Sequence, residues 1–486
     1  MNQLLQTIAE HAKGNPTGIA VQTKHSLTTY FEFYQLINDL ANQLKQQNIK
    51  LLALKADNCL GWLVVDLACQ KSDICLLPIP SFFSKQLTEF VLETSTADAI
   101  VSDTHISELQ EVSDLELIDN LHIFKLENLD QNDALIPSHT SKITFTSGST
   151  GTPKGVCLSI EQMLAVAKSV AEVLPSEQIF KHLCILPLAI LLENVAGVYT
   201  SLLIGARVIL LPMTNVGFTG SSQFSPKVLV EILHQYQPNS HILLPQLLAS
   251  LLQLEDVSFP TSLKFIAVGG GKVAPSQIKN ARELGLPVYE GYGLSESASV
   301  VCLNTKETQK IATVGQFLPH ISAYIAEDGE LIIKGKTFLG YLNDPASWDN
   351  QDLATGDLVE QDSDGYISIS GRKKNLIISS FGRNISPEWI ESAFHQIHGI
   401  NQTIVFGDAQ PNCVALITLH PGVNLKQLDI DISVINEQLP DYAQIKAWSI
   451  LPKSLTHDDG FLTANGRPKR DFITRHFDKE IKTLYQ

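Results

Sequence analysis

Apolar residues recur at helical spacing in the first part of the chain. Between residues 27 and 47, LTTYFEFYQLINDLANQLKQQ, they fall every three or four positions, which predicts an amphipathic helix. Two short apolar runs, ICLLPIP at 74–80 and DAIVSD at 98–103, are typical of buried strands. Strands that alternate with helices predict parallel sheets covered by helices.

Five further apolar runs continue this pattern through the middle of the chain, each with Gly or Pro at or near its end. They are HLCILPL (182–188), ARVILLP (206–212), SHILLPQ (240–246), LKFIAVGGG (263–271) and LPVYEGYG (286–293). Such runs are typical of interior parallel strands. Because the ends of parallel strands meet at one rim, we expect a ligand site there.

The pattern changes after residue 320. YIAEDGELIIKG (324–335), GDLVEQDSDGYISISG (356–371) and KNLIISSFG (374–382) predict hairpin-connected strands with DG turns in the first two. A helix is expected after Ser386, because Ser386 can cap it and Pro387 and Glu388 suit its first turn.

The predicted fold class is therefore α/β with two domains. Residues 1–371 would form a large N-terminal domain of stacked, parallel-rich sheets with helices and a β-rich subdomain. Residues 372–486 would form a small α+β C-terminal domain, with the boundary near 371–374. A chain of 486 residues is too long for one ordinary core.

The amino-acid composition limits the classes of partner that the protein is expected to bind. A hydrophobic fraction of 44% and a charged fraction of 18% fit a soluble globular protein. The formal net charge of −16 disfavours binding to nucleic acid or anionic membranes, so an anion site must gather positive charge locally. The seven cysteines form no CxxC pair and the start lacks a signal-peptide pattern, so we expect free thiols and a cytoplasmic location.

The most apolar segment, residues 186–206, contains Glu193 and Asn194. A charged residue near the middle of a membrane span costs roughly 2.5–3.5 kcal/mol on insertion scales. The segment is therefore expected to be buried core and not a transmembrane helix.

Residues 144–155, TFTSGSTGTPKG, combine hydroxyl side chains and three glycines with Lys154. Glycines let the backbone approach an anion, and successive N–H groups and hydroxyls can cradle phosphate oxygens. The spacing does not match a Walker A loop. Composition alone also allows an exposed flexible loop, but a capping-box pattern at Ser159 and Gln162 indicates a helix after it, and KITF indicates a strand before it.

With Val156 added, this segment resembles the phosphate-loop signature of the acyl- and aryl-adenylate-forming superfamily, which includes acyl-CoA synthetases, peptide-synthetase adenylation domains and firefly-type luciferases. The sequence as a whole is similar to long-chain acyl-CoA synthetases, although it is shorter than they are. Further motifs follow in the family's order over nearly the whole chain. The resemblance implies that the loop and Lys154 hold the phosphates of ATP, through Thr146, Ser147, Gly148, Ser149, Thr150 and Gly151.

Residues 290–296, EGYGLSE, resemble the family motif Y-G-x-T-E. The resemblance implies that Tyr292 stacks on adenine and that Ser295, in place of the usual Thr, contacts the α-phosphate, with Gly293 between them. Glu296 would hold Mg²⁺, which suits a hard carboxylate ligand.

Three more segments carry implied nucleotide and acceptor contacts. Asp357 lies in a T-G-D motif and would bind both ribose hydroxyls, with Arg372 of the motif G-R-x-K-D reaching the same ribose. Lys374 falls at the family's hinge, about which a mobile C-terminal lid rotates. Gly382 would lie where a pantetheine arm passes, and Gly270 in the segment that lines the acyl and adenine pockets.

Two positions depart from the family pattern. Ile190 stands where the family commonly has histidine, while Glu193, a second candidate Mg²⁺ ligand, is kept. In the tail LTANGRPKR (462–470), Arg467 occupies the place of the catalytic lysine, and Lys469 lies two residues on. Arginine is a planar fork, so this exchange is not conservative. Arg467 could take the role of that lysine in adenylation, a shifted register could place Lys469 there, or adenylation could be impaired. We favour Arg467.

The implied reaction joins a carboxylic acid to AMP, releases pyrophosphate and passes the acyl group to a thiol. ATP, Mg²⁺ and CoA, or the phosphopantetheine of an acyl-carrier protein, would be required. The candidate pocket segments are apolar and offer no acid for an amino group, so a fatty or other hydrophobic acid is expected. An acyl-AMP ligase that loads a carrier protein is one alternative, and a catalytically weak nucleotide- or acyl-binding protein, suggested by Arg467, is another.

Overall fold

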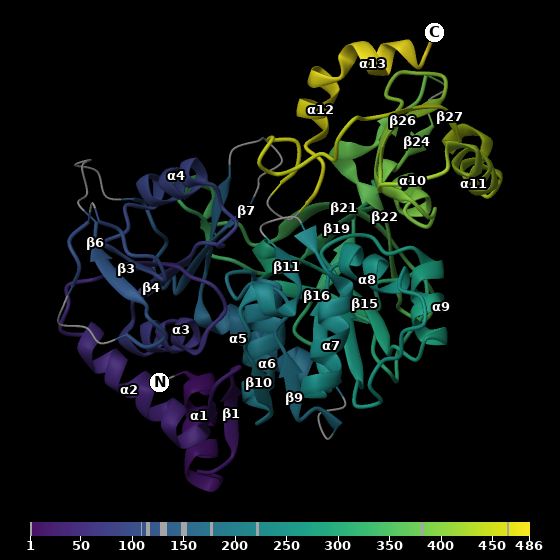
Figure 1. The fold of residues 1–486 in the computed structure, drawn as a ribbon. Helices are drawn as coiled ribbons and strands as arrows, with labels where there is room; N and C mark the ends of the chain where they lie inside the picture. Colours follow the sequence, from purple (N-terminus) through teal and green to yellow (C-terminus); the bar gives the residue numbers. More distant parts are fainter. Residues whose placement is uncertain are drawn as a thin grey trace.

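The computed structural model describes residues 2–107, 109–112, 117–126, 134–146, 153–174, 178–219, 223–380, 383–463 and 466–486. Figure 1 shows a large body of sheets and helices, with the yellow-green C-terminal part resting on one end of it. The predicted α/β fold class is confirmed. The boundary near residues 371–374 stays a prediction.

A nine-stranded sheet forms the centre of the large body. Its order is β17-β16-β15-β14-β13-β9-β10-β1-β2, parallel from β15 to β1 and antiparallel at both edges. The strands are β1 Ile19–Gln22, β2 Leu27–Thr29, β9 Lys181–Leu183, β10 Arg207–Ile209, β13 Ser240–Leu243, β14 Phe265–Val268, β15 Val288–Leu294, β16 Ser299–Leu303 and β17 Gln316–Phe317. All five apolar runs of the middle region thus contribute strands, although Pro245 and the residues after it begin a helix.

A seven-stranded sheet stacks against the first one, in the order β20-β8-β7-β4-β3-β5-β6. Its strands are β3 Leu51–Lys55, β4 Cys75–Pro78, β5 Ala99–Ser102, β6 His122–Lys125, β7 Lys142–Thr146, β8 Lys154–Leu158 and β20 Gly340–Tyr341. The two runs predicted at 74–80 and 98–103 are β4 and β5. The helix expected within 27–47 is α2 (Tyr30–Leu44), capped by Thr29 through a capping box with Glu32.

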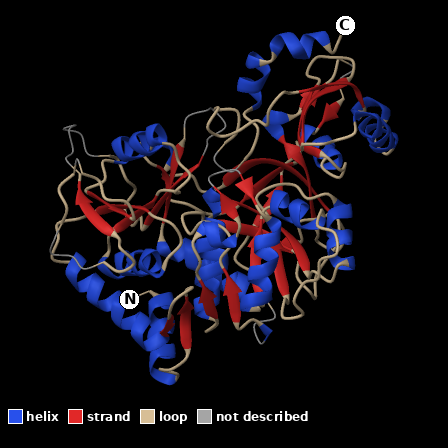
Figure 2. Cartoon of the chain, viewed as in Figure 1, coloured by secondary structure: helices blue, strands red, loops and turns tan. Residues whose placement is uncertain are grey.

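Helices fill the space between the two sheets and cover their outer faces (Figure 2). The shared core contains residues of α1 (Gln3–Gly14), α2, α3 (Leu60–Ser72), α5 (Ile160–Val173), α6 (Thr200–Leu203) and the π-helix η2 (Leu192–Tyr199). The helices α7 (Pro226–Tyr236), α8 (Pro245–Leu252) and α9 (Pro275–Glu283) cover the other face of the central sheet, and α4 (Lys85–Ser95) covers the second sheet. The segment 186–206 lies in this core, and no described helix is long and apolar enough to cross a membrane.

The sequence pattern suggested that a helix directly follows the phosphate-type loop, but a strand comes first. Lys154–Leu158 form the strand β8, which pairs antiparallel with β7 and sets Lys154 opposite Thr146. Val156, Cys157 and Leu158 are fully buried, so this short apolar stretch gains more as a sheet strand than as a helical turn. The capping box is confirmed one residue later: Ser159 and Gln162 cap α5.

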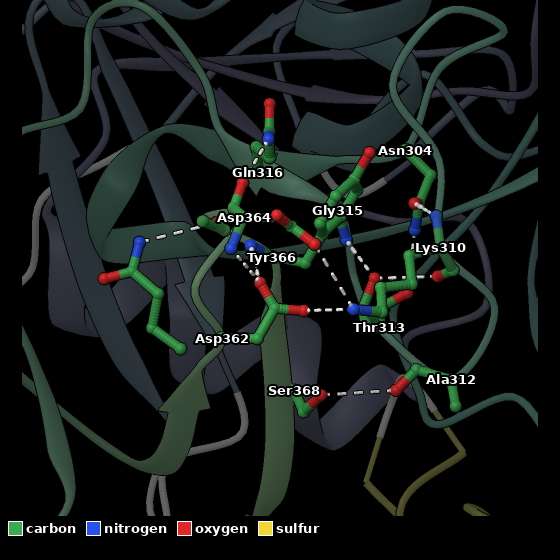
Figure 3. Close-up of polar contacts among 12 residues, drawn as sticks. Asn304, Lys310, Ala312, Thr313, Gly315, Gln316, Asp362, Asp364, Tyr366 and Ser368 are labelled. Carbon is green, nitrogen blue, oxygen red and sulfur yellow. Dashed lines mark hydrogen bonds and ion pairs between the residues drawn. The ribbon is translucent and has the colours of Figure 1, made fainter.

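A four-stranded antiparallel sheet follows, made of β18 Ala323–Ile325, β19 Glu330–Ile333, β21 Leu353–Gln361 and β22 Ile367–Arg372. Both predicted hairpins with DG turns are present in it. Figure 3 shows how the turn of the second hairpin is held: Asp362 accepts the backbone N–H groups of Asp364 and Tyr366 and pairs with Lys310. The hairpin is thereby tied to the segment that precedes β17.

The C-terminal part has a three-stranded sheet of β25 Ile400–Phe406, β26 Cys413–Leu419 and β27 Ile445–Ile450. Its two faces carry separate cores, one with α10 (Pro387–Phe394) and α11 (Leu425–Glu437), the other with α12 (Arg470–His476) and α13 (Asp478–Thr483). The third predicted hairpin is β23 Ile377–Ile378 with β24 Asn384–Ile385. The helix predicted after Ser386 is α10, and Ser386 Oγ accepts from the N–H of Trp389.

Candidate active site

One continuous cleft of about 2360 Å³ runs between the large body and the C-terminal part. The carboxyl ends of the central parallel strands open into it, as the sequence pattern predicted. Among the residues that line it are Gly270, Tyr292, Asp357, Arg372 and Arg467. Residues predicted separately from five distant motifs therefore share one cleft.

Asp357 lies at the centre of a hydrogen-bonded group of three. Arg372 Nε lies 2.6 Å from its Oδ1, and Tyr292 Oη donates to its Oδ2 at 2.5 Å. Arg372 pairs with Asp357 across β21 and β22, which fixes the two side chains side by side. Burial raises the pKa of Asp357, and the Arg372 guanidinium opposes that shift. This group offers a carboxylate, a cation and an aromatic face at one place, which suits a ribose with its attached base.

Arg467 reaches the same region from the other end of the chain. Its Nη2 donates to the carbonyl oxygen of Gly270 at 2.9 Å. The loop that carries it is held by Thr463, whose N–H donates to the Arg467 carbonyl and whose Oγ1 accepts from the Arg467 N–H. Desolvation by the surrounding cleft walls and the nearby Arg372 lower the pKa of Arg467, although the residue keeps an exposed surface, and Asp357 opposes this shift. The guanidinium therefore lies in the electrostatic field of the Asp357 group.

Lys469 lines the cleft as well, but its main described role is structural. Its backbone N–H donates to Phe461, and its carbonyl accepts from Phe472 and Ile473 at the start of α12. Among the described residues its Nζ has no hydrogen-bond partner. Of the two tail residues that the sequence left open, Arg467 is the one whose charged group contacts the wall of the nucleotide region.

Lys154 and Glu296 are connected through a residue that the sequence analysis did not single out. The Nζ of Lys154 lies 4.6 Å from the ring centre of Tyr341, and Tyr341 Oη donates to Glu296 Oε1 at 2.9 Å. Tyr341 belongs to β20, which pairs with the strand that Lys154 begins. Burial, followed by the Glu296 charge, raises the pKa of Tyr341, so the hydroxyl stays protonated and donates. No local pattern around Tyr341 indicates this role, because the role depends on contacts with Lys154 and Glu296, which lie far away in the chain.

The other described residues that were predicted for the nucleotide site line the same cleft. Thr146 ends β7, Ser295 begins the 3₁₀ turn that carries Glu296, and Lys374 lies just after β22; all three line the cleft. A Cβ at Gly293 would lie 1.7 Å from the carbonyl oxygen of Ser299, so only glycine fits there. Six predicted residues, Ser147, Gly148, Ser149, Thr150, Gly151 and Gly382, lie outside the described residues.

A carboxylate at the phosphate end of the cleft suits Mg²⁺, which takes one or two protein carboxylates and completes its shell with phosphate and water oxygens. Glu296 meets that requirement, because its carboxylate lines the cleft. Glu193 does not line it. Its Oε1 contacts His182 Nε2 at 2.8 Å, and its Oε2 accepts from the N–H groups of Ile185 and Leu186. Its role as a second Mg²⁺ ligand stays a prediction, and this geometry does not favour it.

Ile190, which stands where the family commonly has histidine, lines the cleft. A deeper part of the cleft has mainly apolar walls, which include Val170, Leu174, Ala196 and Phe265. Acidic side chains line the cleft as well, among them Glu290, Glu296 and Asp357.

Known proteins resemble the chain over nearly its whole length. A family model described as "AMP-binding enzyme" matches residues 8–342, and "AMP-binding enzyme C-terminal domain" matches residues 374–486. The long-chain-fatty-acid–CoA ligase FadD15 of Mycobacterium bovis is 32% identical over 255 residues, which are 45% of this chain and 42% of the relative. The chain thus matches less than half of that relative's length. The 2-succinylbenzoate–CoA ligase of Staphylococcus epidermidis is 29% identical over 427 residues, 84% of each chain.

Solved structures share the fold. The o-succinylbenzoate CoA synthetase MenE from Bacillus subtilis, in complex with the acyl-adenylate intermediate OSB-AMP, superposes with a TM-score of 0.76 at 22% identity, over 96% of this chain and 97% of that one. The same enzyme in complex with ATP and a magnesium ion gives a TM-score of 0.74 at 23% identity, over 96% and 98%. With the family model matched over most of its length, the chain belongs to the AMP-binding enzyme family.

Proposed function

We propose that this protein activates a hydrophobic carboxylic acid with ATP and transfers the acyl group to CoA. The observation that carries the proposal is the meeting of Tyr292, Asp357, Arg372 and Arg467 in one region of the cleft. It is supported by relatives that are named as acid–CoA ligases.

In the first step a carboxylate oxygen of the acid attacks the α-phosphorus of ATP. The bond to the bridging oxygen of pyrophosphate breaks, and pyrophosphate leaves with its electron pair. Asp357 and Arg372 would hold the ribose, and Lys154 would neutralise the leaving phosphates. A Mg²⁺ ion held by Glu296 would supply further positive charge for the phosphates. Catalysis of this kind is mainly positioning and charge stabilisation.

Arg467 would stabilise the charge that develops between the carboxylate and the α-phosphate. Its guanidinium lies beside Gly270, which follows β14 and lines the cleft. In the second step the thiol sulfur attacks the acyl carbon and AMP leaves. Lys374 lies where the C-terminal part would hinge between the two steps, and such motions commonly complete a second active arrangement.

The acid is proposed to be a fatty acid, because apolar side chains line the deep pocket. An aryl acid is the second candidate, favoured by the 84% coverage of a 2-succinylbenzoate–CoA ligase. A carrier protein as the acceptor remains the alternative within the same chemistry. A nucleotide- or acyl-binding protein with weak catalysis remains the alternative of another class.

Acid-dependent exchange of pyrophosphate into ATP tests the proposal. We expect exchange with at least one straight-chain acid between C4 and C18 or with an aryl acid. Thioester formation with CoA and with a carrier protein, measured in parallel, then identifies the acceptor. The ligase proposal fails if ATP binds but none of these acids supports exchange.

A further inference from the structure

A chain of hydrogen bonds crosses the deep end of the acyl pocket. His182 on β9 contacts Ser240 Oγ on the neighbouring β13 through Nδ1 at 3.0 Å. Its Nε2 contacts Glu193 Oε1 on η2 at 2.8 Å. All three side chains are buried, at 3%, 5% and 0% exposure. The two strands set His182 and Ser240 opposite each other in register, so the contact is built into the sheet.

The end of this chain that lines the cleft is polar, and apolar side chains lie beside it. His182 and Ser240 line the cleft, whereas Glu193 lies behind them. Ala196, Phe265 and Ala267 line the cleft beside the pair. Gly197 makes the arrangement sterically feasible, because a Cβ there would lie 2.6 Å from Glu193 Oε1 and 2.7 Å from His182 Nε2.

Ser240 keeps hydrogen-bonding capacity that no described protein group uses. A serine hydroxyl can donate once and accept twice, and the Oγ of Ser240 has His182 as its one described partner. A polar group in an apolar pocket is costly when its bonds are unmade. Glu193 keeps His182 in place, because two backbone N–H groups hold the other oxygen of the Glu193 carboxylate. The hydroxyl is therefore held in place with unused bonding capacity.

We propose that Ser240, held by His182 and Glu193, is a specificity subsite for acids that carry a hydroxyl or carbonyl oxygen remote from the reacting carboxylate. The inference rests on the proposed acid activation and narrows its substrate class. A plain alkyl chain would leave the remaining bonding capacity of the Ser240 hydroxyl unused. A hydroxyl on the chain would donate to Ser240 Oγ, and a ketone oxygen would accept from the Ser240 O–H when His182 Nδ1–H donates to Ser240. Sites that hydrogen-bond a substrate group discriminate against analogues without it more strongly than apolar pockets discriminate by size.

Metal binding would be a different use of the same cluster, since His182, Cys184 and Glu193 place ligand atoms within 4.8 Å of one another. The 2.8 Å between His182 Nε2 and Glu193 Oε1 is a hydrogen-bond distance. Two ligands at about 2.0–2.2 Å from a tetrahedral zinc ion stay further apart than that. The cluster is therefore a hydrogen-bond relay in this structure.

The test compares acids that differ only in one oxygen. Suitable pairs are dodecanoate with its hydroxy and oxo derivatives at several chain positions, and 4-phenylbutanoate with 4-oxo-4-phenylbutanoate. Dissociation constants from calorimetry and kcat/KM from pyrophosphate exchange are measured for the wild-type protein, Ser240→Ala and Ser95→Ala. Ser95 is a matched control, because it is also buried with one hydrogen bond, to the Leu92 carbonyl, and does not line the cleft.

We expect at least one oxygenated acid to be preferred over its parent by about tenfold or more, the size of one buried hydrogen bond. Ser240→Ala should bring that ratio close to one, and Ser95→Ala should keep it. The inference is overturned if the wild-type protein shows no preference in any pair, or if the preference survives in Ser240→Ala. If acids support pyrophosphate exchange but no oxygenated acid is preferred, the subsite inference fails and the ligase proposal stands. If an oxygenated acid binds preferentially but no acid supports exchange, only the ligase proposal fails.

Discussion

The Nη2 of Arg467 lies 2.9 Å from the carbonyl oxygen of Gly270, although 197 positions separate the two residues in the chain. Gly270 follows β14 with a φ of +83°, a conformation that glycine adopts without strain. The contact brings the loop before α12 onto the rim of the central sheet. It places a guanidinium beside the region where Asp357 and Arg372 would hold a nucleotide.

Replacing the two tail cations one at a time tests which of them serves adenylation. Arg467→Ala should lower kcat/KM for pyrophosphate exchange by about 10²-fold or more, the usual cost of removing a group that stabilises transition-state charge. Lys469→Ala should cost far less, and Arg467→Lys should retain most of the exchange activity. Equal losses in the two alanine variants would contradict the assignment. Thioester formation from a synthetic acyl-adenylate serves as the control, since that step does not need this charge.

Lys154→Ala should reduce turnover strongly, because the side chain would neutralise the phosphates that leave. In the folded protein the Lys154 ammonium makes a modest cation–π contact, 4.6 Å from the Tyr341 ring centre, so the variant should still fold. Pyrophosphate exchange measured against ATP concentration checks this. Near-normal kinetics in the variant would remove Lys154 from the phosphate site.

Tyr341→Phe should weaken the response to Mg²⁺. The Tyr341 hydroxyl orients the Glu296 carboxylate at 2.9 Å, and loss of a group that orients a metal ligand typically costs about 10–100-fold in metal affinity or activity. Exchange rates measured across Mg²⁺ concentrations report the apparent affinity. Tyr324→Phe is the comparison, because Tyr324 is 44% exposed and lies on β18, outside the cleft. An unchanged Mg²⁺ response in Tyr341→Phe would show that Glu296 needs no such support.

His241 should make the protein less stable in mild acid. The side chain is 1% exposed, neither ring nitrogen has a partner among the described residues, and burial, with His182 nearby, lowers its pKa to about 3. The unfolded chain binds a proton here near the usual pKa of about 6.5. Between these two values the unfolded state holds more protons, so stability falls as pH decreases, by about 1.4 kcal/mol per unit at most.

His241→Leu removes this contribution. Urea unfolding at pH 7, 6 and 5 should show the variant gaining stability relative to the wild-type protein as the pH is lowered, and the unpaired polar group is removed at the same time. Equal pH dependence in the two proteins would mean that His241 finds a hydrogen-bond partner in solution.

Local patterns predicted much of the fold, because each depends on neighbours in the chain. The spacing within 27–47, the cap at Ser386 and the DG turns correspond to α2, α10 and the hairpins of the four-stranded sheet. The strand β8 was missed, since its short apolar stretch, Val156 to Leu158, becomes a strand only when β7 and β20 lie on both sides of it. Tyr341 was missed for the same reason: its importance lies in the two residues it contacts.

By itself the sequence predicted the chemistry of the site, because the glycines, hydroxyls and charges that it requires lie in short motifs. It also determined the family, through motifs spread from Thr144 to the tail. Only the tertiary structure showed that the Arg467 guanidinium contacts Gly270, that Glu193 does not line the cleft, and that Glu193, His182 and Ser240 form one hydrogen-bonded chain. The physical reason is that these are contacts between side chains on separate elements, and their distances depend on how the elements pack.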